Sequence, residues 1–308
     1  MNESDKILIT GSSGMVGSAL LKYLKKNNYN NLLTPSHKEL NLINENEVKN
    51  YLIKNMPDFI FAAAAKVGGI ESNMKNSTAF LLENITMQNN LISQAHLCDV
   101  NNLLFYGSSC IYPKYAKQPI NENELLNGYL EETNEAYALA KICGLKLCNY
   151  YKNEYSRNYF SLMPTNLYGN NDNYDENSSH VIPSIIRKIH NAKIHNKTTI
   201  PLFGTGRALR EFLYVDDLAE ASIIAMQKNH EYSLINVGSG KEIKILNLAK
   251  LISKTIGYEL NFKFDKVVPD GTPRKFLNSS RMRSLGWNPK ISLDEGLLMA
   301  YTSYFKNL

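Results

Sequence analysis

The sequence of 308 residues lacks long apolar runs, a strong excess of either charge, and closely spaced metal ligands. No stretch approaches 18 consecutive apolar residues, and no basic region followed by an apolar one opens the chain, so neither a membrane span nor a signal peptide is predicted. The net charge of +5 comes without a long basic run, which argues against nucleic acid as a partner. We therefore expect a cytoplasmic protein that acts on small molecules, with no membrane and no nucleic acid among its partners.

Cysteine is also scarce. The chain has four cysteines, their spacing is not that of a metal site, and we predict no metal. Cys98, Cys143 and Cys148 lie in helical patterns, and we expect them to be buried, reduced structural residues. The hydrophobic content of 44% and charged content of 20% are ordinary for a globular protein, and the length allows one large domain or two modest ones.

A glycine-rich turn follows the first predicted strand. Residues 6–10 are apolar and predict a strand, while residues 18–26 have a helical pattern. The turn before that helix consists of Gly11, Ser12, Ser13, Gly14, Met15, Val16 and Gly17. Between a strand and a helix, such glycines permit close approach of the backbone, and the amino terminus of the helix holds a pyrophosphate. A glycine turn without a ligand is the alternative.

Strand and helix patterns then alternate along the chain. Helices are predicted at 45–55, 77–99 and 134–155, and apolar strands at 58–65, 102–106 and 159–163. This alternation predicts an α/β fold with a doubly wound parallel sheet of the Rossmann type and helices on both faces.

The pattern breaks after residue 166. We predict a nucleotide-binding Rossmann domain of residues 1–166 that also takes in roughly 210–238. Residues 167–209 and 239–308 would then form a smaller mixed α/β substrate lobe. Within the second half, Asp216 and Asp217 are expected to cap a helix that runs to residue 227.

The predicted sheet suggests which cofactor binds. Ala63, Ala64 and Ala65 end a strand with small side chains, which leaves room for a flat ring and its sugar. The end of the second strand, near residue 33, faces the adenosine ribose in this fold, where an acidic residue favours NAD and a basic one NADP. His37 and Lys38 are the cations there, so we favour NADPH. Both also fit solvated loop charges, and NADH stays the alternative.

Three side chains have the chemistry to act on a carbonyl. Tyr137 and Lys141 lie one turn apart on a helix face, and a lysine cation there favours the phenolate, lowering a pKa that is ordinarily about 10. Ser108 ends an apolar strand and can hydrogen-bond the same reacting oxygen. Together they polarise a carbonyl and deliver a proton. A tyrosine and a lysine at this spacing are, however, more often a packed ring and a solvated charge.

The motifs GxxGxxG, a small-residue strand end, a strand ending in serine and YxxxK, in this order, resemble the extended short-chain dehydrogenase/reductase family. Further segments (LNL, AAKVGGI, GSSCIYPK, MPTNLYG, SHVIP, REFLxVDD, NVGSG and PDGTPRK) resemble its GDP-L-fucose synthase branch over nearly the whole chain. The resemblance implies an NADPH-dependent epimerase/reductase whose substrate is a GDP-linked 4-keto-6-deoxy sugar.

The resemblance also assigns roles to residues. Ser108, Tyr137 and Lys141 match the reductase triad, while Cys110 and His180 match the pair that inverts carbons 3 and 5. A thiolate and an imidazole suit that step because both titrate near neutral pH. Outside these motifs, a small buried thiol and a loop or cap histidine would be the ordinary interpretations.

The remaining site assignments follow the same motifs. Cofactor contacts are expected from Asn41, Leu42, Pro164, Asn166, Leu167 and His180, besides Tyr137 and Lys141. Substrate contacts are expected from Ser108, Ser109, Cys110, Asn166, Val181, Arg187, Lys188, Phe203, Arg210 and Lys275, with the basic residues meeting the diphosphate.

Two departures from the family pattern concern these contacts. Ser13 stands where an arginine often reads the extra phosphate of NADP, which shifts that role to His37 or Lys38. Lys188 stands where an arginine is usual, which weakens bidentate phosphate binding.

Other functions stay open on the sequence. The nearest is C4 reduction of a related GDP-4-keto-6-deoxy-heptose or dideoxy sugar for bacterial surface polysaccharide, with or without epimerisation. A dehydratase, a simple 4-epimerase and a cofactor-binding regulator without turnover are less favoured. The family resemblance also implies a homodimer through the helices at 77–99 and 134–155.

Overall fold

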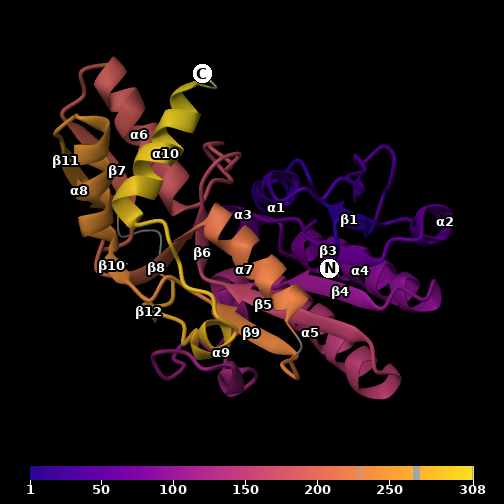
Figure 1. The fold of residues 1–308 in the computed structure, drawn as a ribbon. Coiled ribbons are helices and arrows are strands. Elements are labelled where there is room, and N and C mark those ends of the chain that lie inside the picture. Colours follow the sequence, from indigo (N-terminus) through magenta and orange to yellow (C-terminus); the bar gives the residue numbers. More distant parts are fainter. Residues whose placement is uncertain (229, 266–270, 307) are drawn as a thin grey trace.

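The computed structural model describes residues 1–228, 230–265, 271–306 and 308. Its first lobe is built on a parallel sheet with strand order β2–β1–β3–β4–β5–β9 (Figure 1). The strands are β1 (Ile7–Thr10), β2 (Leu32–Leu33), β3 (Phe59–Ala62), β4 (Asn102–Tyr106), β5 (Asn158–Pro164) and β9 (Leu234–Val237). Most of their side chains are buried, as short apolar runs in a parallel sheet require.

Helices cover both faces of this sheet. One apolar core lies beneath α2 (Glu45–Asn55), α4 (Ser77–Leu97) and α5 (Glu135–Tyr155). A second core lies beneath α1 (Met15–Lys26) and α7 (Val215–Gln227) on the other face. The predicted α/β fold with a doubly wound Rossmann sheet is therefore confirmed.

The strand order places a crevice at the glycine turn. Strand β1 pairs with β2 on one side and with β3 on the other, so the chain reverses its direction of winding at β1. In open α/β sheets ligands bind at such a switch point, beyond the carboxyl ends of the strands. The glycine turn directly follows β1, and the three alanines 63–65 directly follow β3, so both segments border this crevice.

The second lobe packs smaller sheets against helices, around a third apolar core. Figure 1 shows it beside the first lobe, with α6, α8 and α10 on its outer side. Its elements are β6 (Asn166–Tyr168), α6 (Val181–Ile194), β7 (Thr199–Phe203), β8 (Leu209–Tyr214), β10 (Glu242–Lys244), α8 (Ile245–Ile256), β11 (Asn261–Asp265), β12 (Arg274–Lys275) and α10 (Leu293–Lys306). The short helix α9 (Ser280–Ser284) instead packs against β9 of the first lobe, and its Met282 belongs to the second core. The first two residues of the PDGTPRK segment, Pro269 and Asp270, lie outside the described residues.

Two local expectations from the sequence are wrong. Helix α7 is preceded by Tyr214 without a side-chain cap, and the carboxylate of Asp217 instead accepts the N–H groups of Lys290 and Ile291. Cys98 is half-buried and Cys143 exposed, and only Cys148 is buried. The short helix α3 (Ile70–Lys75) follows the third strand. The domain limits stay a prediction.

Candidate active site

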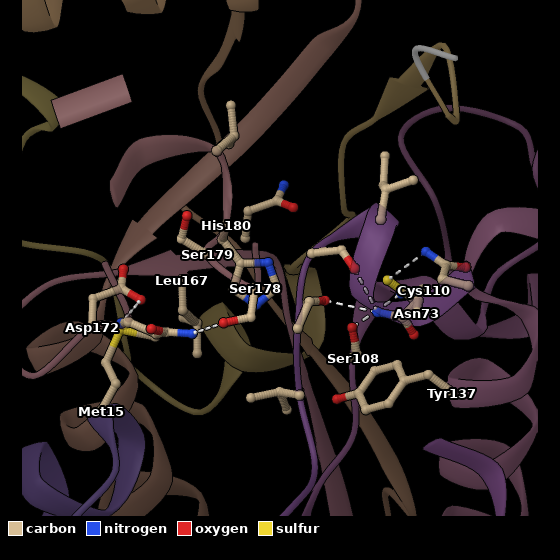
Figure 2. A pocket seen from close by; sticks show the side chains of 18 of the residues that line it. Met15, Asn73, Ser108, Cys110, Tyr137, Leu167, Asp172, Ser178, Ser179 and His180 are labelled. Carbon is tan, nitrogen blue, oxygen red and sulfur yellow. Dashed lines mark hydrogen bonds between the residues drawn. The ribbon is translucent and has the colours of Figure 1, made fainter. Parts of the chain in front are cut away.

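A cavity of about 880 Å³ is lined by residues of both lobes. The glycine turn and the ends of β3, β4 and β5 contribute to its wall, and so do α6, β8 and β12 of the second lobe. Figure 2 shows His180 and Ser179 on one side of this space and Ser108, Cys110 and Tyr137 on the other.

The glycine turn has room only for glycine. Gly11 has φ of +69°, and a Cβ there would lie 2.8 Å from the Cα of Ala64. A Cβ on Gly17 would strike the carbonyl oxygen of Gly11. Helix α1 begins after Gly14 without a side-chain cap, so its first backbone N–H groups can donate hydrogen bonds to a ligand. This backbone cradle fits a pyrophosphate.

Most residues predicted to bind the cofactor line the cavity. They are Gly11, Ser13, Gly14, Met15, Val16, Gly17, Ala63, Ala64, Ala65, Tyr137, Lys141, Pro164, Asn166, Leu167 and His180. Ser12, His37, Lys38, Asn41 and Leu42 are not part of the lining. His37 and Lys38 are exposed, whereas the side chain of Leu42 is buried in the first core.

The three residues that match the reductase triad come from two adjacent elements. Tyr137 and Lys141 lie on the first turns of α5, and Ser108 follows β4. Lys141 is buried, and its Nζ donates a hydrogen bond of 2.8 Å to the carbonyl oxygen of Tyr106. Phe80 of α4 packs edge-on against the Tyr137 ring, with centroids 6.4 Å apart. The sequence prediction that these three side chains meet at one cavity wall fits this arrangement.

The expected direction of the Tyr137 pKa shift is wrong for this structure. Burial raises the pKa of Tyr137, and the nearby Cys110 raises it further. Burial lowers the pKa of Lys141 to about 7, so its charge is only partly present at neutral pH. Desolvation outweighs the charge interaction considered from the sequence, because both groups lie inside the protein.

Cys110 lies in a short 3₁₀ turn (Ser109–Ile111) directly after Ser108. Its N–H donates to Ser108 Oγ at 3.2 Å. Its Sγ accepts hydrogen bonds from Asn134 Nδ2 at 3.3 Å and from Lys275 Nζ at 3.4 Å. Burial by itself raises the pKa of Cys110, but the charge of Lys275, with smaller contributions from Ser108 and Arg210, produces a net lowering.

His180 faces the thiol side from the second lobe (Figure 2). It is the residue before α6, and it contributes no side-chain cap to that helix. Its ring is exposed to the cavity yet surrounded by protein, so burial lowers its pKa, and the charge of Lys275 lowers it further.

A strap, defined as residues 170–180, connects the two lobes across the cavity. Asn171 Nδ2 donates to Ser18 Oγ of α1 at 3.0 Å. The N–H of Gly69 donates to the carbonyl oxygen of Ser178 at 3.0 Å, and a Cβ on Gly69 would lie 2.7 Å from the carbonyl oxygen of Ser179. These contacts fix the position of His180, the last residue of the strap.

The predicted substrate contacts fall into two groups. Arg210, Lys188, Phe203, Val181 and Lys275 line the cavity, and the Lys188 ammonium lies 4.5 Å from the centroid of the Phe203 ring. Arg187 is not part of the lining and lies 3.5 Å from the Glu176 carboxylate. Ser109 and Asn166 also line the cavity, and Asn166 donates to the Glu211 carbonyl oxygen at 2.7 Å.

Some cavity residues were not identifiable from the sequence. Asn134 contacts the thiol, and Asp172 lies beside Met15 at the glycine turn (Figure 2). Asparagines are common in this chain and no spacing rule singles one out. The only available signal for Asn134 was its place three residues before Tyr137. Across the described residues, no group of three or more potential metal ligands is found, and no helix is long and apolar enough to span a membrane.

Known sequences resemble this chain over nearly its full length. Residues 7–238 match the NAD dependent epimerase/dehydratase family. GDP-L-fucose synthase from Escherichia coli (strain K12) is 45% identical over 311 residues, covering 98% of this chain and 97% of that protein. GDP-L-fucose synthase 1 from Arabidopsis thaliana is 44% identical over 307 residues, covering 100% and 95%.

Solved structures agree with this similarity. A GDP-6-OMe-4-keto-L-xylo-heptose reductase from C. jejuni superposes with a TM-score of 0.94 at 30% identity, covering 100% of this chain and 99% of that one. The GDP-mannoheptose C4 reductase from Campylobacter jejuni with NADP bound gives a TM-score of 0.90 at 32% identity, with 99% of each chain covered.

Proposed function

The chain belongs to the NAD dependent epimerase/dehydratase family, and from this membership we propose that it is an NADPH-dependent epimerase/reductase of a GDP-linked 4-keto-6-deoxy sugar. It would invert carbons 3 and 5 and then reduce the 4-ketone, as in a GDP-L-fucose synthase. The similarity to such synthases at 44% and 45% identity supports this substrate class.

The observation that carries the proposal is the placement of two acid–base groups on facing walls. Cys110 and His180 lie on opposite sides of the cavity, with Ser108 and Tyr137 beside the thiol (Figure 2). Inverting a carbon next to a ketone requires one group to remove a proton and another to return a proton on the opposite face. An enzyme that only reduces the ketone has no use for Cys110 and His180 as acid–base groups.

The cofactor site fits a nicotinamide dinucleotide. The glycine cradle and the uncapped start of α1 would hold the pyrophosphate, and Ala63, Ala64 and Ala65 line the cavity beside it. The bound cofactor supplies a hydride to carbon 4. NADP in a related reductase supports NADPH, and His37 and Lys38 are the cations we assign to its extra phosphate. A loss of preference for NADPH over NADH in Lys38→Gln would test this assignment.

Proton movements are assigned to the chain's own residues. The Cys110 thiolate removes the proton at carbon 3 or 5, and the 4-ketone stabilises the resulting enolate. His180 returns a proton from the other face, and its lowered pKa makes the imidazolium a stronger acid. Ser108 donates a hydrogen bond to the oxygen at carbon 4, and Tyr137, protonated because its pKa is raised, delivers the proton when that carbon is reduced.

Arg210, Lys188 and Phe203 are assigned to the GDP part of the substrate. All three line the cavity in the second lobe. A guanidinium and an ammonium suit the diphosphate. The Phe203 ring, half exposed at 50%, offers a face on which a base can stack.

Isotope exchange tests the proposal directly. The protein is incubated in heavy water with GDP-4-keto-6-deoxy-mannose and without NADPH. We expect deuterium at carbons 3 and 5, and at least a hundredfold slower labelling in Cys110→Ser, since general acid–base groups contribute about 10²–10⁴-fold. If no deuterium is incorporated while added NADPH is still oxidised, the epimerase assignment fails and the reductase assignment remains.

A second candidate is a C4 reductase for a GDP-linked 4-keto heptose. It is favoured by the TM-scores of 0.94 and 0.90 to two such reductases. Steady-state turnover with hexose and heptose substrates separates the two functions. A higher kcat/KM for the heptose would support this candidate.

We further propose that the enzyme is a cytoplasmic homodimer. Helices α4 and α5 lie side by side (Figure 1) and expose Leu82, Leu97, Leu139 and Tyr150. Apolar side chains on paired helices suit a helical bundle with a second copy. Light scattering of wild type and Leu82→Lys tests this assembly, and a monomeric wild type would contradict it.

A further inference from the structure

Lys275 makes an unusual contact for a residue assigned to a substrate diphosphate. The side chain is 8% exposed, and its ammonium lies 3.4 Å from the sulfur of Cys110. Among the described residues, no carboxylate forms an ion pair with it. Its neighbour Arg274, in contrast, is neutralised by two hydrogen bonds to Glu242. A buried cation requires a compensating charge, and the group in contact is the thiol.

We propose that Lys275 is a positioning residue that holds Cys110 as a thiolate and so prepares it to act as a base. The role of this thiolate as a base in epimerisation rests on the proposed function. The ionisation of the Cys110 thiol does not, because it takes place in the protein without substrate. The diphosphate is then left to Arg210 and Lys188.

The surroundings of the sulfur fit an anion. Two donors, Lys275 Nζ and Asn134 Nδ2, point at Sγ. Ser108 Oγ accepts the N–H of Cys110, and Ser108 also makes a smaller contribution to lowering the pKa of the thiol. A sulfur that accepts two hydrogen bonds from side chains gains from carrying the negative charge, because charge-assisted hydrogen bonds are the stronger ones.

The charged and titratable groups that act on the thiol come from three elements. Lys275 of β12 and Arg210 of β8 are cations, and Tyr137 of α5 is an uncharged phenol. The net effect lowers the pKa of Cys110, with Lys275 the largest favourable contribution. Lys275 also lowers the pKa of His180. One cation therefore increases the fraction of Cys110 that is thiolate at neutral pH and makes the imidazolium of His180 a stronger acid.

The position of Lys275 is fixed by the sheet of the second lobe. Lys275 pairs with Arg210 in the register of β12 and β8. The next two residues are anchored, because Phe276 donates its N–H to Gln118 Oε1 at 3.0 Å and Leu277 donates its N–H to Glu211 Oε2 at 3.1 Å. Glu211 is fully buried and also accepts the N–H of Gly240 at 2.7 Å. The ammonium is therefore held at the sulfur by the fold rather than by a flexible loop.

Alkylation by iodoacetamide measures the thiolate directly, because the thiolate sulfur displaces iodide and forms a thioether. The rate at Cys110 is followed by mass spectrometry of its peptide from pH 5 to 10, with neither sugar nor cofactor present. A short peptide with a single cysteine, whose pKa is about 8.5, is alkylated in the same buffers as the reference thiol. We expect Cys110 to reach its plateau at lower pH than this peptide. In Lys275→Met the rate at pH 7 should fall roughly tenfold or more, since loss of an opposite neighbouring charge disfavours the thiolate.

Two further variants keep the test decisive. Lys275→Arg retains the cation and should restore the wild-type pH profile, whereas Lys250→Met removes an exposed lysine of α8 and should leave it unchanged. An unshifted Cys110 profile in Lys275→Met, or a Lys275→Arg profile like that of Lys275→Met, would overturn the proposal. Circular dichroism checks that each variant is folded.

The catalytic consequence is measured separately. Lys275→Met should slow deuterium exchange at carbons 3 and 5 roughly tenfold or more at pH 7, recover towards wild type as the pH rises, and change KM little. A large rise in KM with normal exchange at saturation would instead assign Lys275 to the diphosphate. If wild type exchanges no deuterium but the alkylation profiles behave as expected, the proposed function fails while the ion pair stands.

Discussion

The ammonium of Lys141 is hydrogen-bonded to the carbonyl oxygen of Tyr106, 2.8 Å away, and this bond joins helix α5 to the end of strand β4. It fixes the spacing between Tyr137 on the helix and Ser108 just beyond the strand. Burial, and not this hydrogen bond, lowers the pKa of this lysine to about 7, so the enclosure of the site makes the lysine charge sensitive to pH.

Ketone reduction should therefore lose efficiency in alkaline solution. As the pH rises through about 7, Lys141 loses its proton. Well above this pH, kcat/KM for NADPH oxidation should fall by about tenfold per pH unit. Lys141→Arg stays charged throughout this range, so its kcat/KM should not fall above pH 7. The interpretation is wrong if kcat/KM falls in the same way for both proteins.

Removing the phenol should separate reduction from epimerisation. Tyr137→Phe lacks the proton donor, and NADPH oxidation should fall by about 10²–10⁴-fold. Deuterium exchange at carbons 3 and 5 should persist, since Cys110 and His180 are untouched. Fluorescence titration should give an NADPH affinity close to wild type. Undiminished NADPH oxidation would point to a different proton donor.

A methyl group at Gly69 should disturb the strap. Its Cβ would lie 2.7 Å from the carbonyl oxygen of Ser179, and such overpacking costs about 1–3 kcal/mol. His180 is the next residue, so Gly69→Ala should slow deuterium exchange by roughly tenfold or more, because small misplacements of reacting groups are costly.

Ser179→Ala is the matched control for this change. It retains the carbonyl oxygen and removes a hydroxyl for which the described part of the chain offers no hydrogen-bond partner, so exchange should stay near wild type. Equal rates in Gly69→Ala and wild type would show that the strap does not position His180.

Asp172 should make stability depend on pH. Burial raises its pKa to about 7, although the N–H of Asn173 opposes this. The folded protein then keeps a proton that the unfolded chain, with a pKa of about 3.9, releases. Stability falls as the pH rises through this window. At pH 8, Asp172→Asn should increase the free energy of unfolding by on the order of a few kcal/mol at most and so raise the melting temperature. At pH 4 it should change the melting temperature little.

Asp175 of the same strap provides the comparison. It is exposed, and hydrogen bonds from Ser178 and Asn177 lower its pKa. Asp175→Asn should therefore give no gain at pH 8. A gain of the same size in both variants would indicate a general charge effect instead.

The fold was largely predictable, because strand and helix periodicities of this chain are strong. Helix α2 and strand β4 have the predicted limits. Short-range capping was less predictable: Asp217 binds backbone groups of residues 290 and 291, about 70 positions later in the chain. No local pattern encodes such a contact.

The candidate site shows the same division. Motifs identified Cys110, Tyr137, Lys141 and His180 because their spacing and flanking residues are distinctive. The direction of the Tyr137 pKa shift was not predictable, since it depends on how completely the ring is enclosed. The contact between Lys275 and Cys110 joins residues 165 positions apart, and it required the pairing of β12 with β8 to be known.

The last strand of the first-lobe sheet comes from a late part of the sequence. Strand β9 pairs with β5, yet β6, α6, β7 and β8 of the second lobe lie between them in the chain. A fragment ending near residue 166 would leave one sheet edge bare and lack α7, so we expect it to aggregate rather than bind nucleotide. Exchanging substrate lobes between relatives would accordingly need at least three splice points, one near residue 166 and one on either side of this returning segment.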